Sequence, residues 1–445
     1  MTIAAVATPP GRGAIAIVRV SGPDVREIAA RIVRSQSPLR PHVATTAEIL
    51  DEDGATLDRG IAILAPAPHS YTGEDVLELH IHGSPVIARE MLRTLLACGA
   101  RLAAPGEFTR RAFLNGKMEL NAAAAVADLI AAETRGAARA ALANLAGGLA
   151  AEVGRQREAL SRILEELAAA IDFPDEVAEP ERGPVASRLR EIERELRDLQ
   201  RSGEVGRLVR EGTSVAIVGP PNAGKSSLLN ALLGEERALV SELPGTTRDT
   251  IEESIVVEGV SVRLIDTAGI RAHADRLESA GIERTMRAIE QVRIVIVVID
   301  GSVPIDAGAR DVLERTAGRE RVLFCNKADL GEAGARELRP HAPICGSVHD
   351  AQTLASLRAE IARIGWNGER IDLERPHLAS AVEFDAVREA LGALARANVT
   401  LEAGEPIDLI AGDLQQAVAA LGHVTGDVAG EELLDRIFAR FCIGK

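Results

Sequence analysis

The sequence predicts a multidomain chain in which an α+β domain is followed by an all-α domain that carries an inserted α/β domain. Three observations predict this fold class. Short β-type runs separated by turns fill residues 1–117, helical periodicity fills 118–210 and returns in 374–445, and apolar runs alternate with helical stretches in 211–373. The length of 445 residues also favours two or three domains, because a single hydrophobic core rarely grows so large.

The first domain contains three candidate strands and one clear helix. The runs AIAIVRV (14–20), IAILAP (61–66) and DVLELHIHG (75–83) have the composition and length of strands, and turn residues separate them. SPVIAREMLRTLLACG (84–99) has apolar residues at helical spacing. This mixture predicts an α+β domain over residues 1–117.

The rest of the chain changes pattern twice. Residues 118–210 are helical almost throughout, with a break at IDFPDE (171–176). From residue 211 the runs SVAIVG, VRLIDTAG, RIVIVVID and RVLFCN alternate with helices, which is typical of a mainly parallel, doubly wound sheet buried on both faces. Because helical periodicity resumes over 374–445, we expect the α/β unit (211–373) to be inserted between the two halves of the helical domain.

The composition limits how this chain can contact RNA. The net charge of −15 argues against a broad basic surface that binds nucleic acid by neutralising phosphates. Aromatic residues make up only 2%, which argues against a sheet that stacks bases on aromatic rings. Any RNA contact is therefore expected to be local or shared with a partner.

The sequence favours a cytoplasmic protein that does not contact a membrane. No apolar run approaches the roughly 18 residues of a membrane span, and the first residues lack the pattern of a secretory signal. The four cysteines, Cys98, Cys325, Cys345 and Cys442, are far apart and show no disulfide-framework spacing, which fits a reducing compartment.

A phosphate-binding loop is the strongest local signal. GPPNAGKSS (219–227) matches G-x4-G-K-[ST] and lies between a predicted strand and a predicted helix. Gly219 and Gly224 allow the backbone N–H groups to wrap the phosphates, Lys225 reaches the β and γ phosphates, and the Ser226 hydroxyl binds Mg²⁺.

Two further motifs each end a predicted strand. In DTAG (266–269), Asp266 can hold Mg²⁺ through water and the Gly269 amide can contact the γ-phosphate. In NKAD (326–329), the Asp329 carboxylate can accept two hydrogen bonds from guanine that adenine cannot offer, which is worth on the order of 1–3 kcal/mol. The expected base is guanine. Ser347, in the loop CGSVHD, is a further candidate contact.

A switch loop is expected at GTTRD (245–249), where Thr247 would close on Mg²⁺ when the γ-phosphate is present. Threonine pairs are common in loops, and the position of this pair after the phosphate-binding loop favours the switch interpretation. Ile270 follows DTAG, so the glutamine that orients the attacking water in Ras-like GTPases is absent and another group must do this.

Taken together, the motifs resemble those of the MnmE (TrmE) family of tRNA-modification GTPases. The resemblance rests on TPPGRGAIAIVRVSG, on PGEFTRRAFLNGK (105–117), on IDFPDE, on the terminal FCIGK and on guanine-nucleotide motifs within a helical domain, and it covers essentially the whole chain. It implies that the inserted unit is a Ras-like P-loop GTPase domain and that the first domain is of a folate-binding type.

The resemblance also implies how GTP is hydrolysed. In the family a K⁺ ion lies beside the phosphates, here held by Asn222, Ser241, Leu243 and Thr246, and can neutralise charge as an arginine finger does elsewhere. The water-orienting residue of the family falls on Glu278. The candidate GTP-binding residues are Asn222, Ala223, Gly224, Lys225, Ser226, Ser227, Ser241, Thr246, Thr247, Asp266, Thr267, Ala268, Gly269, Asn326, Lys327, Asp329 and Ser347, with Ser226 and Thr247 on Mg²⁺.

For the first domain, the resemblance implies a homodimer that binds a one-carbon tetrahydrofolate, either the 5,10-methylene or the 5-formyl derivative. The family's folate-binding residues fall on Arg19, Glu78, Lys117 and Lys445. A pterin ring offers hydrogen-bond donors to a carboxylate, and the glutamate tail of folate offers carboxylates to cations. On sequence pattern alone, Arg19 and Glu78 are simply charged residues on predicted strands.

The function expected from the resemblance is K⁺-dependent GTP hydrolysis coupled to tRNA modification. With a flavin-dependent partner of the MnmG (GidA) type, in a heterotetramer or larger complex, such enzymes add an aminomethyl-type or carboxymethylaminomethyl group to carbon 5 of the wobble uridine. A regulatory or ribosome-assembly GTPase without modification chemistry is the alternative, since its nucleotide motifs would look the same.

Two smaller features have competing interpretations. His80 and His82 would face one side of a strand, but two imidazoles without nearby carboxylates or thiols make a poor zinc site. In FCIGK, Gly444 and Lys445 do not fit a prenylation box. Cys442 is therefore either a reactive thiol or ordinary apolar packing, and both interpretations stay open. The family resemblance implies that CIGK lies near the bound folate, where Cys442 could be a catalytic thiol.

Overall fold

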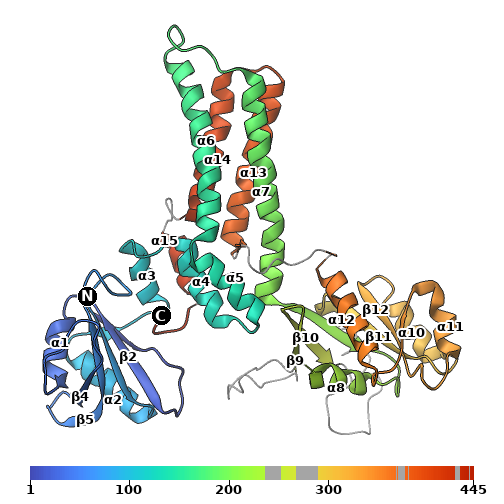
Figure 1. The fold of residues 1–445 in the computed structure, drawn as a ribbon, viewed down its shortest axis with the longest axis horizontal. Helices are drawn as coiled ribbons and strands as arrows, with labels where there is room; N and C mark the ends of the chain where they lie inside the picture. The colour runs from blue at the N-terminus through green and yellow to red at the C-terminus, as the bar shows by residue number, and fades with distance from the viewer. Residues whose placement is uncertain are drawn as a thin grey trace. The chain divides into compact units, whose positions relative to one another are not determined.

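The computed structural model describes residues 1–235, 252–266, 289–366, 368, 376–378, 380–425, 431–439 and 441–445. The chain divides into two compact units (Figure 1). The first unit comprises Met1–Ala127, Asn144–Arg194 and Ala381–Lys445, and the second comprises Asp128–Ala143 and Glu195–Ser380.

The first unit begins with a seven-stranded sheet in the order β3-β4-β5-β6-β2-β1-β7, in which only the β1–β7 pair is parallel. Its strands are β1 (Ile3–Val6), β2 (Ile15–Ser21), β3 (Val33–Arg34), β4 (Thr45–Leu50), β5 (Thr56–Ala65), β6 (Val76–His82) and β7 (Arg101–Leu102). Three helices accompany it: α1 (Val25–Ile32), α2 (Pro85–Ala97) and α3 (Glu107–Leu114). The strands and the helix predicted over 84–99 are confirmed.

The alternation of residues along the strands separates two faces of this sheet. Val18 of β2 and Leu77 and Leu79 of β6 are fully buried, and they pack with Met91 of α2 in one core cluster. Side chains at the intervening positions lie on the opposite face, because successive residues of a strand point to opposite sides. Arg19 and Glu78, predicted to be site residues, are on this second face.

The first unit also contains long helices. Helix α14 packs against both α6 and α13. The helices that follow the sheet domain are α4 (Leu120–Ala131), α5 (Arg135–Leu145), α6 (Gly148–Asp172), α7 (Arg182–Glu211), α13 (Ala381–Glu402), α14 (Ile407–Thr425) and α15 (Glu431–Phe438). Of these, α4, α5 and α7 have residues in both units. The predicted break at 171–176 is confirmed, because α6 ends at Asp172 and α7 begins at Arg182. Among the described residues, no helix has the length and apolarity of a membrane span.

The second unit is built on a six-stranded sheet in the order β13-β12-β11-β8-β10-β9, parallel except for the β9–β10 pair. Its strands are β8 (Thr213–Val218), β9 (Glu252–Val257), β10 (Val260–Asp266), β11 (Ile294–Asp300), β12 (Arg321–Asn326) and β13 (Ile344–Cys345). Its helices are α8 (Lys225–Glu235), α10 (Ala307–Arg315), α11 (Ala333–Leu338), the 3-10 helix η1 (Arg339–His341) and α12 (Ala351–Gly365). The doubly wound α/β fold predicted for this region is confirmed.

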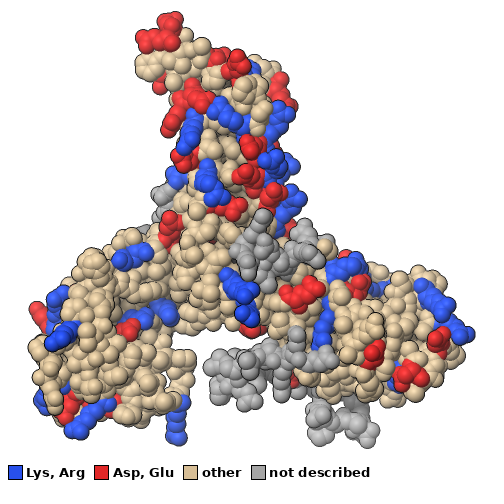
Figure 2. Space-filling model, in the orientation of Figure 1, with Lys and Arg blue, Asp and Glu red and all other residues tan. Residues whose placement is uncertain are grey.

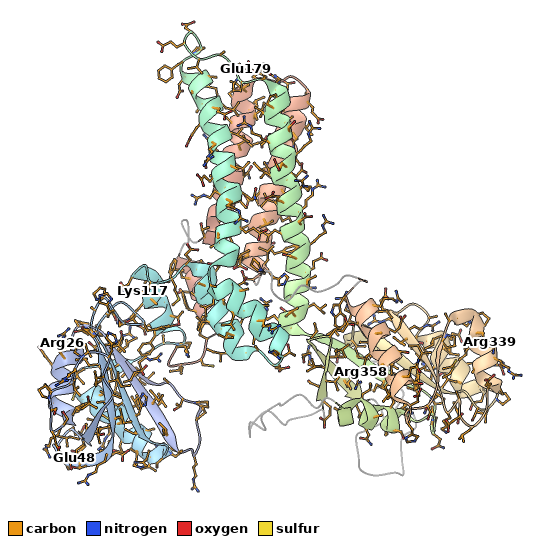
Figure 3. The ribbon with its side chains drawn as sticks, in the orientation of Figure 1. Arg26, Glu48, Lys117, Glu179, Arg339 and Arg358 are labelled. Carbon is orange, nitrogen blue, oxygen red and sulfur yellow. The ribbon has the colours of Figure 1, made fainter. Side chains whose placement is uncertain are left out.

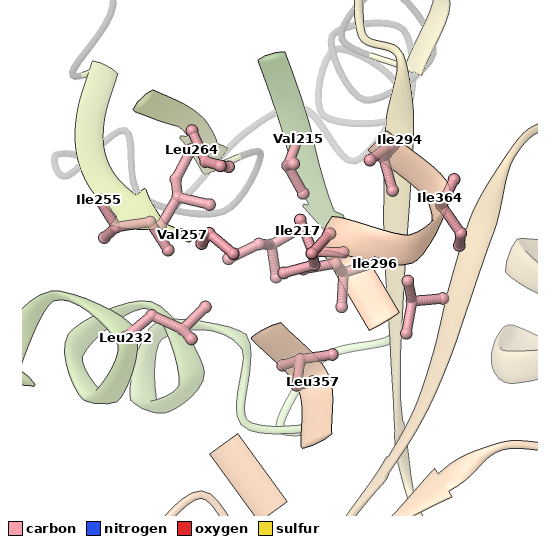
Figure 4. Packing of buried hydrophobic residues seen from close by; sticks show 14 of the residues in the cluster. Val215, Ile217, Leu232, Ile255, Val257, Leu264, Ile294, Ile296, Leu357 and Ile364 are labelled. Atoms are coloured by element: carbon pink, nitrogen blue, oxygen red, sulfur yellow. The ribbon is translucent and has the colours of Figure 1, made fainter. Parts of the chain in front are cut away.

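Both faces of this sheet are buried, which explains the continuous apolar runs in the sequence. Figure 4 shows Val215 and Ile217 of β8 in one cluster with Leu232 of α8 and Leu357 of α12. A second cluster, on the other face, includes residues of β11 together with Leu338 of α11.

A piece of the predicted helical domain packs in the second unit. Ala137 and Ala140 of α5 belong to the cluster of Figure 4, and the Thr134 hydroxyl donates a 2.7 Å hydrogen bond to the Gly259 carbonyl. The sheet therefore takes part of its cover from residues within 118–210. The domain boundaries deduced from the sequence stay a prediction.

Candidate functional site

The phosphate-binding loop requires glycine at two positions for reasons visible in the structure. Gly219 follows β8 with a φ of +155°, and a Cβ there would lie 2.2 Å from the Val298 carbonyl oxygen. Gly224 has a φ of +100°, and a Cβ there would lie 2.2 Å from Asn326 Nδ2. Any side chain at either position would displace backbone or the buried Asn326, so this fold requires the two glycines of the motif.

Helix α8 starts where phosphates are expected. Lys225 Nζ donates hydrogen bonds to the carbonyls of Gly219 and Pro220 at 2.9 and 2.8 Å, so its ammonium group is folded over the loop. Ser226 and Ser227 are exposed in the first turn. The unpaired N–H groups and dipole of a helix N-terminus favour an anion, and an exposed hydroxyl beside it can bind Mg²⁺.

Asn326 joins three segments of the nucleotide site. It is 2% exposed at the end of β12, and its Nδ2 donates to the Ala223 carbonyl at 2.9 Å. Its Oδ1 accepts a 3.3 Å hydrogen bond from the backbone N–H of Val348, which follows β13. The side chain therefore ties the phosphate-binding loop to the loop that carries Ser347.

Lys327 has an acidic partner that the sequence motifs did not indicate. Its Nζ donates to the Asn222 carbonyl at 2.8 Å and to Asp300 Oδ2 at 2.7 Å. Burial raises the pKa of Asp300, but hydrogen bonds from Lys327 and Ser302 outweigh burial, so the net pKa is lowered and the carboxylate stays charged. The sequence could have indicated this partner, because Asp300 ends a predicted strand, and that strand lies next to β12 in the sheet.

The other residues predicted to contact guanine lie at the same edge of the sheet. Asp329 is exposed, two residues beyond Lys327. The Ala328 N–H donates to the Gly346 carbonyl at 3.0 Å, which holds the NKAD loop beside the loop of Ser347. The Ser347 hydroxyl accepts a 3.3 Å hydrogen bond from the His349 N–H. Hydrogen bonds thus join Asn326 and Lys327 to the phosphate-binding loop at Ala223 and Asn222, and Asp329 and Ser347 lie in the adjoining loops.

Several predicted residues lie outside the described part of the chain. These are Ser241, Leu243, Thr246, Thr247, Thr267, Ala268, Gly269 and Glu278. Asp266 ends β10, and its side chain is likewise outside the description. Their roles stay predictions.

A second polar cluster lies on the second face of the first unit's sheet, where Phe108 and Tyr71 also pack. Arg19 and Glu78 are register partners on β2 and β6, and Arg19 Nε donates to Glu78 Oε1 at 2.8 Å. Their side chains are 15% and 27% exposed. The Arg19 guanidinium also lies over the rings of Tyr71 and Phe108, 5.6 and 5.7 Å from their centroids, which fixes its plane.

The last residues of the chain reach this cluster. The Gly444 carbonyl accepts a 3.3 Å hydrogen bond from Arg19, and the Lys445 carbonyl accepts one of 3.2 Å from the Phe108 N–H. Burial lowers the pKa of Lys445, the positive charge of Arg19 lowers it further, and the carboxylate of Glu78 opposes both effects. Arg19, Glu78 and Lys445, which the family resemblance assigned to one site, therefore meet in one place.

Apolar packing holds this tail in position. Phe441 is buried in a cluster with Leu120, Ala123, Leu434 and Phe438. The ring centroids of Phe438 and Phe441 are 5.4 Å apart. Because this cluster combines residues of α4 and α15, it fixes where Cys442–Lys445 leave the helices.

Lys117 and Cys442, the other predicted site residues of the first unit, make their hydrogen bonds to residues outside the cluster of Arg19, Glu78 and Lys445. Lys117 is exposed beside α3 (Figure 3) and its Nζ donates to the Pro68 carbonyl at 3.0 Å, so it lies on the loop that carries Tyr71. Cys442 is exposed, and its carbonyl accepts a 3.5 Å hydrogen bond from the Gly106 N–H. Roles for both residues stay predictions.

The two histidines do not form a metal site among the described residues. His82 Nδ1 lies 2.8 Å from Asp58 Oδ1, whereas His80 Nε2 lies 3.6 Å from Glu78 Oε2. Within the described ranges, no group of three or more His, Cys, Asp or Glu residues is arranged to hold a metal ion. His80 Nε2 is buried and has no hydrogen-bond partner there.

A mainly parallel α/β sheet whose β8–α8 loop has this geometry, with an NKAD loop hydrogen-bonded to it, defines a P-loop GTPase. Comparison with known proteins then identifies the family. Residues 2–117 match the family model described as GTP-binding protein TrmE N-terminus, and residues 120–442 match the model described as MnmE helical domain. The chain belongs to the MnmE family of tRNA modification GTPases.

Full-length relatives agree with this assignment. The tRNA modification GTPase MnmE of Symbiobacterium thermophilum is 44% identical over 456 residues, which cover 100% of this chain and 99% of that protein. The protein of the same name from Laribacter hongkongensis is 43% identical over 450 residues, with 100% and 99% covered. That of Thermotoga maritima is 40% identical over 453 residues, with both chains covered completely.

Proposed function

We propose that this chain couples K⁺-dependent GTP hydrolysis to the modification of carbon 5 of the wobble uridine in tRNA, adding an aminomethyl or carboxymethylaminomethyl group. A flavin-dependent protein of the MnmG type would be its partner, and a one-carbon tetrahydrofolate, as the 5,10-methylene or 5-formyl derivative, would be its cofactor. The observation that carries the proposal is the meeting of Arg19, Glu78 and Lys445 on the second face of the first sheet.

The residues of this cluster fit a folate. The Glu78 carboxylate suits the donors of a pterin ring, and the ammonium groups of Lys445 and Lys117 suit the carboxylates of the glutamate tail. His80 Nε2, buried on the same strand without a hydrogen-bond partner in the described part, is a polar atom that a ligand can satisfy. When bound, the folate would supply the one-carbon unit.

Binding of the folate can be tested directly by isothermal titration with 5-formyltetrahydrofolate. We expect micromolar or tighter binding to the full chain and a clear loss with Glu78→Ala, because a ring donor then has no acceptor. Absence of binding to the wild-type chain at micromolar concentrations would remove the folate from the proposal.

Cys442 is proposed as a catalytic thiol for the one-carbon unit. Its thiol is exposed two residues before Gly444, which contacts Arg19. The test is Cys442→Ser, assayed by tRNA modification and, separately, by folate titration. Loss of modification with folate affinity retained supports a reacting thiol. Full modification would limit the tail to closing the site.

For the GTPase cycle, we propose that Ser226 and Thr247 bind Mg²⁺ and that Asn222, Ser241, Leu243 and Thr246 bind K⁺. The K⁺ would supply positive charge between the β and γ phosphates. Asn222 has a φ of +62° and its carbonyl is engaged by Lys327, while the residue itself is exposed, which leaves its side chain accessible to an ion. Glu278 is the proposed water-orienting residue.

The ion requirement can be tested by comparing GTP hydrolysis in K⁺ and in Na⁺ at equal ionic strength. We expect hydrolysis to be much slower in Na⁺ and the difference to shrink in Asn222→Ala. Equal rates in the two salts for the wild-type chain would remove Asn222 from the proposed ion site.

We further propose a cytoplasmic homodimer that binds tRNA together with its flavoprotein partner. Figure 2 shows Lys and Arg interspersed with Asp and Glu along the helices on the face drawn, and the net charge is −15. Such a surface gives few uncompensated contacts to phosphates, so a shared binding surface is favoured. Wobble-nucleoside analysis of tRNA from cells lacking the protein is the decisive experiment, and unchanged nucleosides would favour a regulatory switch.

A further inference from the structure

Two free cysteines are register partners at the edge of the nucleotide-binding sheet. Cys325 on β12 pairs with Cys345 on β13 in a parallel ladder, and neither forms a disulfide. Paired residues on neighbouring strands point to the same side of a sheet, and strands lie about 4.8 Å apart. That spacing is within the Cα separation of about 4.4–6.8 Å that disulfides span.

The two thiols have different environments. Cys325 is fully buried in the apolar cluster that includes Leu338, whereas Cys345 is exposed and its thiol donates a 3.8 Å hydrogen bond to the Pro343 carbonyl. Burial raises the pKa of the Cys325 thiol to about 12, and a side-chain hydrogen bond and charge interaction with Cys345 add to this rise. Cys345 is therefore the thiol that an oxidant reaches first.

Each cysteine lies directly before a loop that carries residues predicted to contact guanine. Asn326 follows Cys325, and Ser347 comes two residues after Cys345. The Gly346 N–H donates to the Cys325 carbonyl at 3.0 Å, and the Val348 N–H donates to Asn326 Oδ1 at 3.3 Å. A change in the distance between the two strands is thus transmitted to the loops beside the base.

We propose that Cys325 and Cys345 form an oxidative modification site, in which a reversible disulfide lowers the affinity of the protein for guanine nucleotides. Hydrogen peroxide or a chemically similar peroxide is the oxidant. The Cys345 thiolate attacks one peroxide oxygen, the O–O bond breaks, and water leaves after protonation, which gives a sulfenic acid. The Cys325 sulfur then attacks Cys345, the S–S bond forms, and the second oxygen leaves as water with the Cys325 proton. Two thiols lose two electrons in total and one peroxide becomes two waters.

The expected loss of affinity follows from the geometry of the strands. A disulfide holds the two Cβ atoms at about 3.8 Å and so constrains the spacing of β12 and β13, which two free thiols leave adjustable. Strand β13 spans only Ile344–Cys345 and, within the described part of the chain, has β12 as its one neighbour, so it moves more easily than β12. The movement shifts Val348 and Ser347 relative to Asn326. Loss of one hydrogen bond in this network corresponds to about tenfold weaker nucleotide binding.

The test uses the full chain, hydrogen peroxide and a fluorescent GDP analogue. After oxidation, mass spectrometry of a tryptic digest is expected to show peptide 322–327 joined to peptide 337–358. The dissociation constant for the analogue is expected to rise about tenfold and to return after treatment with dithiothreitol. Absence of the joined peptides, or an unchanged dissociation constant once they have formed, would overturn the proposal.

Two variants distinguish the effect of oxidising Cys325 and Cys345 from the effect of oxidising other cysteines. Cys345→Ser, at an exposed position, is expected to bind the analogue normally and to lose the response to peroxide. Cys98→Ser removes a free cysteine of the first unit and is expected to keep the response. A response that persists in Cys345→Ser, or that dithiothreitol does not reverse, would assign the effect to another oxidation and contradict the disulfide.

Discussion

Replacing Gly444 by alanine adds one methyl group where the tail crosses the first sheet. Gly444 has a φ of +99°, and a Cβ there would lie 2.5 Å from the Val6 carbonyl oxygen and 2.9 Å from Ala7 Cα. Both neighbours are backbone atoms, so no side chain can rotate to relieve the clash. The tail must therefore leave its place beside Arg19.

The structure sets the size of this effect. A non-glycine residue in the left-handed region costs about 1–2 kcal/mol, and the clash adds to that cost. If Lys445 binds the folate, affinity for 5-formyltetrahydrofolate should fall at least about tenfold, the equivalent of about 1.4 kcal/mol. Isothermal titration measures the fall. An unchanged affinity would refute the reasoning that the tail completes the site.

Gly99→Ala is a matched control. Gly99 has a nearly identical φ of +96°, but a Cβ there would have no atom within 4 Å. The control therefore carries the same backbone strain without the clash. We expect it to lower the thermal stability slightly and to leave folate affinity unchanged, so a loss of affinity in both variants would point to a global effect.

Three further changes test other contacts. Burial raises the pKa of Glu107, but hydrogen bonds, chiefly from Arg101, outweigh it and lower the pKa from 4.5 to about 2. The stability that Glu107 contributes is thus present above about pH 4.5 and lost as the pH falls through about 2, so acid-unfolding curves of Glu107→Gln should depend less on pH in this window. Asp329→Asn should prefer xanthosine to guanosine nucleotides in competition binding, because an amide N–H can donate to the 2-oxo group, by about 1–3 kcal/mol. Asn326→Ala should weaken GDP binding by about 1–3 kcal/mol in titrations, because it leaves the Ala223 carbonyl and the Val348 N–H without their partner.

Most of the described nucleotide site could be predicted because its residues lie in short motifs, each made of neighbouring residues in the sequence. Gly219 and Gly224 are required by local backbone conformation and close backbone approach, so the motif itself contains the structural information. Asp300 was missed because its contact with Lys327 joins two different strands and depends on their register. Aligning the carboxyl ends of the predicted parallel strands places Asp300 beside the NKAD loop and would have indicated this contact.

The residues predicted to bind folate show a different limit of prediction from sequence. Strand alternation places Arg19 and Glu78 on the face opposite Val18, Leu77 and Leu79, but a charged residue on a strand is usually only solvated, and only the family resemblance gave them a role. Their meeting with Lys445 depends on how Phe441 packs, which is a contact between segments far apart in the sequence. No local pattern specifies such a contact.

The energetics of the tail explain why a single methyl group should matter at Gly444. Ordering the backbone of residues 441–445 costs about 1–2 kcal/mol per residue, or roughly 5–10 kcal/mol. Burial of the Phe441 ring contributes about 2–3 kcal/mol, and the hydrogen bonds to the carbonyls of Cys442, Gly444 and Lys445 contribute about 1 kcal/mol each. The two totals are similar, so the tail is held only marginally by the protein itself. A ligand that binds Lys445 therefore also stabilises the ordered tail. A substitution that favours the detached tail must in turn weaken the binding of that ligand, by about the free energy with which it favours detachment.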